Sequence, residues 1–171
     1  MNQSGERGVI DKATASAVTA KQNGVAVIGR VARILERELQ HVITDWHFRV
    51  KQEPDLTCIA LSFEERAGHL PRFLHDVIVR LRLDAGTKAP ISEAAGHHGK
   101  LRWQQGYTVA MMVEELRLLQ IGIFTILHAN VKHLELTTLL PNIVMIADEV
   151  DAQLKQQVLG FLAADMTKLV R

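Results

Sequence analysis

Cysteine, proline and aromatic residues are scarce in this chain, which has one cysteine, four prolines and 5% aromatic residues among 171 positions. Cys58 cannot form an internal disulfide, and the sequence has no cysteine pair of the kind that holds zinc. A single thiol persists most readily in a reducing compartment, so we expect a cytoplasmic protein. Because the segment around Cys58 is apolar, its thiol is predicted to be a small buried side chain and not a nucleophile.

An excess of charge of either sign is also missing, since 20 lysines and arginines face 19 acidic residues and the formal net charge is +1. This balance creates no general field that attracts nucleic acid or anionic lipid. A DNA-recognition helix after the turn at Gly106 would begin with residues 108–115, which are apolar and acidic where base readout needs basic or amide side chains. We therefore expect neither a nucleic-acid partner nor a membrane partner.

Long apolar runs and catalytic motifs are absent as well. The longest strongly apolar stretch, residues 116–127, is interrupted by polar residues and by Gly122, and it is shorter than the roughly 20 residues of a membrane span. Residues 1–23 lack the continuous apolar core of a secretory signal, and we expect them to form a flexible lead. Without a glycine-rich phosphate loop or a nucleophile elbow, the sequence does not predict an enzyme.

What the chain does contain is apolar residues at helical spacing, and the 47% hydrophobic content suits a single core. We expect one helical domain over residues 24–171, an all-α bundle of about five or six helices with a long last helix. The first stripe runs from Ile28 to Val50 and predicts a helix of about seven turns that ends before Pro54. Residues 55–61 fit either a helical turn or an extended connector.

Capping residues mark the next helices. Ser62 and Glu65 form an S-x-x-E capping box before a stripe at residues 63–81, which predicts a second helix bent near Pro71. After a loop at residues 84–90, Ser92 is expected to cap a helix that runs to Gln105, and Gly106 supplies a left-handed stop.

Two longer helices follow. Thr108 is expected to cap a helix that is apolar on nearly all sides through Leu134, in which Gly122 predicts a close crossing with another helix. The last helix is expected to start at Thr137 or Thr138, with Pro141 in its first turn, and to run almost to Arg171. Its length of roughly 30 residues allows part of it to project beyond the bundle.

The eight histidines are candidate metal ligands, and their spacings show whether they can share an ion. His97 and His98 are adjacent, so on a helix they point about 100° apart and do not share an ion. Glu65 with His69 and Glu93 with His97 have i,i+4 spacing, which is more typical of solvated pairs than of a metal site. A di-iron bundle needs two Glu-x-x-His motifs, and the sequence offers the spacing once, at Glu38 and His41. We expect no metal site.

Two histidines carry alternative functions. His128 follows Leu127 on the apolar helix and is the best-placed residue for a haem or ligand site, although a core or boundary histidine is the commoner interpretation. His75 is followed by Asp76, as in a phosphoacceptor box, but Arg72, Asp76 and Arg80 are spaced as the charge ladder of a solvated helix face. A haem or small-ligand sensor would need a cavity around His128 or His75. A phosphotransfer module would use His75.

The segment from His97 to Leu119 resembles the N-terminal domain of RsbT co-antagonist proteins, which occur in stressosomes and at the N-terminus of some sensor histidine kinases and transcription regulators. The resemblance is carried by a turn and the helix after it, at Arg102, Gln105, Gly106, Tyr107 and Arg117. Leu116 departs from the pattern, because relatives often have an aromatic residue there. The resemblance implies a globin-like bundle that usually lacks haem, forms homodimers and precedes a variable output domain.

The same turn has a purely structural interpretation. Gly106 permits the reversal, Tyr107 can pack across the corner, and Arg102 and Gln105 can bond carbonyls at a helix end.

The last helix carries a stripe at Val150, Leu154, Val158 and Phe161, which is either ordinary core or a homodimer face. The function that follows is a non-catalytic signal-input and dimerisation domain without a resident cofactor. We expect its last helix to pass a change in packing to an output domain or to a partner regulatory protein.

Overall fold

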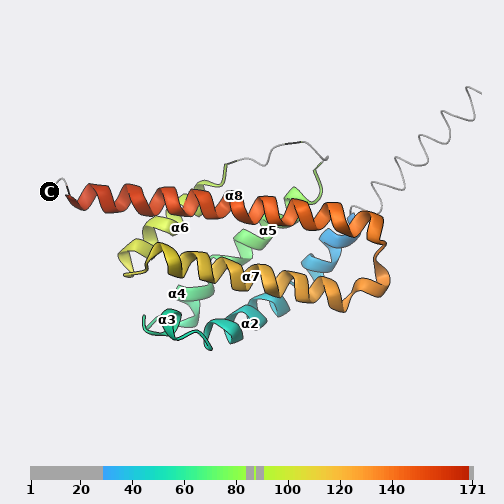
Figure 1. Cartoon of the computed structure of the whole chain (residues 1–171), viewed down its shortest axis with the longest axis horizontal. Helices are drawn as coiled ribbons and strands as arrows, with labels where there is room; N and C mark the ends of the chain where they lie inside the picture. Colours follow the sequence, from blue (N-terminus) through green and yellow to red (C-terminus); the bar gives the residue numbers. More distant parts are fainter. Residues whose placement is uncertain (1–28, 84–86, 88–90, 170–171) are drawn as a thin grey trace, which may run out of the picture.

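The computed structural model describes residues 29–83, 87 and 91–169, and within these ranges every regular element is a helix (Figure 1). The predicted all-α class and the long last helix are therefore confirmed. The expected lead at residues 1–23 lies outside the described residues, as do Ile28 and most of the 84–90 loop. After a helical segment at residues 29–37, the elements are α2 Leu39–Val50, α3 Pro54–Thr57, α4 Phe63–Ala67, α5 Leu70–Arg80, α6 Glu93–Gln104, α7 Val109–Ala129, the 3₁₀ turn η1 Val131–His133 and α8 Leu136–Leu169.

The first predicted helix is interrupted once. Glu38 leaves the helical conformation at φ −94° and ψ 8°, and α2 starts after it. Its N–H still bonds the Ile34 carbonyl and its carbonyl still accepts from Val42, so the two segments continue in nearly the same direction. The predicted apolar face is buried along both segments, including Val31 and Trp46.

The connector at residues 55–61 begins as the single helical turn α3 and then extends. Leu56 is buried and Cys58 is exposed, so the prediction of a buried thiol was wrong. The physical reason is that one short turn can direct only one of its sides into the core, and Leu56 occupies that side.

The predicted second helix is two helices. The capping box at the start of α4 is confirmed, because the Glu65 N–H donates to Ser62 Oγ at 3.2 Å and the Ser62 N–H donates to Glu65 Oε2 at 2.8 Å. The chain then turns at Gly68 and His69, and Pro71 lies in the first turn of α5, where its missing N–H costs no helical bond.

The turn between α6 and α7 has the predicted chemistry. Ser92 Oγ accepts from the Ala95 N–H at 3.3 Å, Gly106 has φ +84°, and Thr108 Oγ1 accepts from the Met111 N–H at 3.2 Å. The end of α7 comes earlier than predicted, at Ala129 and not at Leu134. Here Asn130 ends the helix, since its side chain and its backbone N–H both donate to the Ile126 carbonyl.

Close backbone contacts join two pairs of helices, α2 with α7 and α6 with α8. At Gly122 of α7 a Cβ atom would lie 3.3 Å from the Asp45 carboxylate on α2, which confirms the predicted crossing. The contact of α6 with α8 is much tighter, because a Cβ at Gly99 would lie 1.8 Å from the Gln157 carbonyl oxygen and one at Gly160 would lie 2.0 Å from the Gly96 carbonyl oxygen. Neither position tolerates a side chain while the backbones stay in place.

Helix α8 spans the length of the molecule and packs mainly on α6, with further contacts to α7 and α5 (Figure 1). It starts at Leu136, where the Glu135 carbonyl accepts from the N–H groups of Thr138 and Leu139, so Thr137 and Thr138 lie inside the helix and do not cap it. Pro141 lies inside the helix as well, beyond the predicted first turn. No helix among the described residues has the length and apolar character needed to cross a membrane.

The expected projection of α8 is small. Near its end, the Asp165 carboxylate still accepts from Trp103 of α6 at 3.1 Å, and Lys168 lies over the same indole ring.

Candidate functional site

The turn that carries the family resemblance lies over a buried ionic network. Arg102 is 0% exposed and donates to both carboxylate oxygens of Glu115, at 3.0 and 3.2 Å. It also donates to the carbonyls of Glu65 and Arg66 in the last turn of α4, at 3.2 and 2.8 Å, and to the Gln105 side chain at 2.8 Å. Arg102 therefore caps α4 from α6 and neutralises an acid on α7.

Tyr107 and Arg66 complete this network. The Tyr107 hydroxyl donates to Glu115 at 2.7 Å and accepts from Arg66 at 2.6 Å, while Arg66 also donates to the Ile59 carbonyl at 2.7 Å. The Arg102 guanidinium lies 4.6 Å from the centroid of the Tyr107 ring. Burial raises the pKa of Glu115, and the two guanidinium groups and the tyrosine hydroxyl oppose this.

Each side chain of the network bonds at least one other member, so the network links α4, α6 and α7. The structural interpretation of the turn is thus the one that its contacts support. Glu115 and Arg66 were not identified from the sequence, although a carboxylate within an otherwise apolar helix is a usable signal. Arg117 lies outside the network, being exposed and bonded to Glu114 at 2.8 Å.

A second group of buried polar residues lies along the inner side of α8. Asn142, Glu149, Gln153 and Gln157 are each at most 4% exposed. Gln153 donates to Glu149 Oε1 at 3.0 Å, but Glu149 Oε2, Gln157 Nε2 and Asn142 Oδ1 have no partner among the described residues. Unpaired polar atoms are costly in a core, so this face of α8 differs from ordinary packing.

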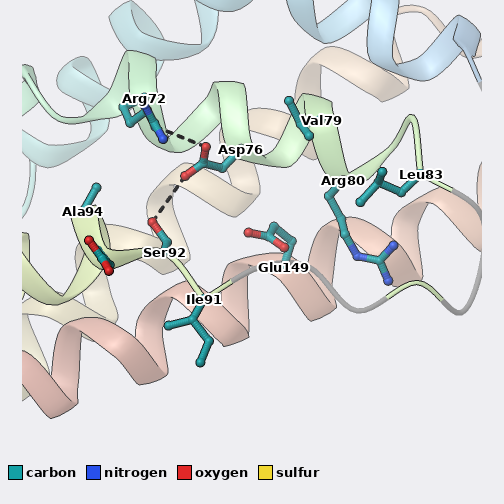
Figure 2. Close-up of a pocket in the computed structure, with 10 residues that line it drawn as sticks. Arg72, Asp76, Val79, Arg80, Leu83, Ile91, Ser92, Ala94 and Glu149 are labelled. Carbon is teal, nitrogen blue, oxygen red and sulfur yellow. Dashed lines mark hydrogen bonds and ion pairs between the residues drawn. The ribbon is translucent and has the colours of Figure 1, made fainter.

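Glu149 lines a cleft of about 470 Å³ between α5, α8 and the start of α6 (Figure 2). Arg80 of α5 lines the same cleft, is 8% exposed, and has no partner for Nε or Nη1 among the described residues. Its Nη2 lies 3.8 Å from the Asp148 carboxylate of α8. Across the opening, Arg72 pairs with Asp76 at 3.2 Å and Ser92 donates to Asp76 at 3.3 Å, so the predicted ladder covers Arg72 and Asp76 while Arg80 turns to α8.

An adjoining cleft of about 230 Å³ is lined by His69 and His98. Their rings stack at 3.6 Å between centroids with an angle of 19° between planes. Burial lowers the pKa of His98 to about 3, with Arg102 and His97 acting in the same direction. Burial likewise holds the pKa of His69 well below its usual range, so both rings are neutral at physiological pH.

The remaining histidines are placed as follows. His128 and His75 are exposed and line neither of these two clefts. His97 is exposed while His98 is buried, as adjacent helical positions predict. His41 lies 3.7 Å from Glu38, an exposed i,i+3 pair.

In the described part of the chain, no group of three or more histidine, cysteine or acidic side chains is arranged to hold a metal ion. The expected pairing of Glu65 with His69 does not form, because Glu65 is engaged by the capping box. Cys58 Sγ contacts the Asp55 carbonyl at 2.9 Å.

The stripe considered as a dimer face packs mainly within the chain. Val150 is 3% exposed and belongs to the core, and Leu154, Val158 and Phe161 are partly buried against it. The exposed apolar side chains of α8 are different ones. They are Leu136, Leu140, Val144, Leu159, Leu162 and Met166, with exposed fractions of 44–67%, and we call them the outward stripe.

Comparison with protein-family models, curated proteins and solved structures gives no match. The resemblance to RsbT co-antagonist domains therefore stays a prediction from the residues around the turn.

Proposed function

We propose that this chain is a non-catalytic signal-input domain that forms a homodimer through α8 and passes a change in the position of that helix to a regulatory partner or output domain. The observation that carries the proposal is that the two sides of α8 differ in an unusual way. Its inner side has charged and amide side chains with polar atoms that lack partners among the described residues, and its outer side has the outward stripe. One rigid helix thus connects a cleft with a surface suited to a second protein.

The outward stripe supports pairing because its apolar side chains share one side of the helix. Val144 and Leu162 are about five full turns apart and so point in the same direction. From Leu136 to Met166 the stripe extends for about 45 Å. Among the described residues, half of the large apolar side chains found exposed belong to α8, although it is one helix among several. Such a concentration is typical of an interaction surface.

A second copy of the chain is the partner that fits this stripe. Its apolar residues fall into two groups of three, separated by the exposed residues Asp151 and Lys155. Antiparallel pairing about residue 153 places Val144 opposite Leu162 of the second copy and Asp151 opposite Lys155 of the second copy. Parallel pairing would instead face each charge with an equal charge. A two-fold interface requires this kind of self-complementarity.

Sedimentation of the whole chain tests the proposal. We expect a dimer at micromolar concentration, and we expect Val144→Glu to be a monomer, because the glutamate would lie in an apolar contact. Val144 is 67% exposed, so the substitution leaves the fold of each chain intact. The matched control is Val113→Glu on α7, where the valine is 43% exposed and lies outside the outward stripe, and this variant should stay dimeric. A monomeric wild-type chain, or a dimeric Val144→Glu variant, would contradict the proposal.

A further inference from the structure

The cleft between α5 and α8 is lined by two buried groups of opposite charge that form no ion pair with each other. Arg80 is 8% exposed and Glu149 is 4% exposed, and both line the opening (Figure 2). Arg80 Nε and Nη1 and Glu149 Oε2 have no hydrogen-bond partner among the described residues. A charged group that is buried without partners is costly, and functional sites are where such a cost is commonly kept.

Each charge is held away from the other by its own contacts. Arg80 Nη2 is oriented toward Asp148 at 3.8 Å, and Glu149 Oε1 accepts from Gln153 at 3.0 Å. The contact with Asp148 is long, so a carboxylate that enters the cleft would pair with this guanidinium more closely. Glu149 Oε2 accepts no hydrogen bond from the described residues. A ligand that presents an acceptor and a donor together would satisfy both groups at once.

The charges around the opening narrow the class of ligand. The charged residues that line the cleft are Arg72, Arg80, Asp76, Glu93 and Glu149, so acids outnumber bases, with Asp148 close by. A simple anion would meet Arg80 but also several carboxylates, and a simple cation would leave Arg80 unpaired. Burial raises the pKa of Glu149, Asp76 and Asp148 add to that effect, and Gln153 and Arg80 oppose it. An ammonium group beside the carboxylate would oppose it further and is therefore a favourable neighbour.

The walls add an apolar component. Val79 and Leu83 of the α5 side and Ile91 before α6 line the same cleft. Its volume of about 470 Å³ lies in the usual range of small-molecule sites and exceeds what two charged groups alone would fill.

We propose that this cleft binds a free α-amino acid with an apolar side chain, whose carboxylate bonds Arg80 and whose ammonium group bonds Glu149. The apolar side chain lies against Val79, Leu83 and Ile91. The binding site itself is inferred from the geometry of the cleft alone. That binding also acts as the signal rests on the proposed function, because Glu149 belongs to the middle of α8, close to the centre of the expected dimer contact.

Calorimetric titration of the whole chain with L-valine, L-leucine, L-isoleucine, L-methionine and L-phenylalanine tests the site. We expect at least one of them to bind. For the best binder, the analogue without the amine and the analogue without the carboxylate should each bind at least about tenfold more weakly, the loss expected for one charged hydrogen bond. For leucine these analogues are 4-methylpentanoate and 3-methylbutylamine. If no amino acid binds, or if either analogue binds as tightly as the amino acid, the proposal fails.

Substitutions at the two charged residues test whether the amino acid binds in this cleft. Arg80→Gln and Glu149→Gln should each weaken it at least about tenfold, whereas Arg117→Gln, at an exposed pair on α7, should leave it unchanged. Because each glutamine removes a buried charge that is only partly compensated by the described residues, the free Arg80→Gln and Glu149→Gln proteins should melt no lower than the wild type, which a merely structural role would not allow. If Arg80→Gln does not fold, Arg80→Lys keeps the charge and loses the fork, and the same loss of binding is expected. Binding that all of these variants retain would overturn the site, and it would leave the sedimentation result untouched.

Discussion

Arg102→Met is expected to lower the free energy of unfolding by about 3–5 kcal/mol, the usual cost of breaking a buried ion pair from one side. Arg102 is 0% exposed and makes hydrogen bonds to Glu115, to two backbone carbonyls of α4 and to Gln105. Methionine fills similar space but leaves the Glu115 carboxylate, 3% exposed, with only Tyr107 and Arg66. Since domains are stable by about 5–15 kcal/mol, this loss is a large fraction of the total.

Urea unfolding followed by far-ultraviolet circular dichroism measures this difference. The chain offers a matched control in Arg117→Met, because Arg117 pairs with Glu114, the neighbour of Glu115, but is exposed. That variant should lose no more than about 1 kcal/mol. The double variant Arg102→Met with Glu115→Met should be less destabilised than the sum of the two single variants, since neither charge is then left alone. Equal losses for Arg102→Met and Arg117→Met would refute the assignment of the network as the clamp of the bundle.

Two further predictions concern the buried histidines and the contact of α6 with α8. The pKa of His98 is about 3 in the folded chain and about 6.5 in the unfolded chain, so unfolding takes up a proton below pH 6.5. His98 alone should therefore lower the free energy of unfolding by about 2 kcal/mol between pH 7 and pH 5. Urea titrations at both pH values should show a smaller fall in the free energy of unfolding for His98→Gln and an unchanged fall for the exposed control His128→Gln. Equal falls in the two variants would show that His98 is not responsible. Gly99→Ala places a Cβ 1.8 Å from the Gln157 carbonyl oxygen and should cost about 3 kcal/mol, whereas Gly29→Ala meets nothing within 4 Å and should be neutral or slightly stabilising by thermal unfolding. Equal melting temperatures for the two alanine variants would contradict the tight helix contact.

The features that the sequence predicts correctly depend on local chemistry. The caps at Ser62, Ser92 and Thr108 and the left-handed Gly106 follow from side chains that satisfy nearby backbone groups. The crossing at Gly122 is also visible, because a glycine inside an apolar helix needs a packing reason.

Helix ends that depend on distant contacts are predicted less well. The last helix starts before Thr137, and α7 stops at Ala129 although apolar residues continue at helical spacing. Periodicity reports which side of a helix is apolar, but it does not report where the neighbouring helix allows the chain to turn.

The candidate cleft was not predicted, since its two charged residues come from helices far apart in the sequence. In sequence, Arg80 completes an i,i+4 ladder with Asp76, and Glu149 is one acid in a mixed stretch of the last helix. Only the packing of α5 on α8 brings them to one opening. In the same way, the stripe at Val150 has the spacing of a dimer face, but it packs mainly within the bundle, whereas Val144, about 120° around α8 from Val150, is exposed.

The most direct test of the account is the distance between two spin labels in the assembled protein. With Cys58→Ser as background, a nitroxide at Thr167→Cys would lie on an exposed position near the end of α8, outside the outward stripe. Antiparallel pairing about residue 153 separates the two labels by about 40 Å along the helices, at about 1.5 Å per residue. A double electron–electron resonance distance near this value is expected. A much shorter distance, set by the spacing of roughly 10 Å between packed helix axes plus the outward reach of the two labels, would mean parallel helices. The absence of any coupling between labels would mean a monomer, and either result would contradict an antiparallel homodimer formed through α8.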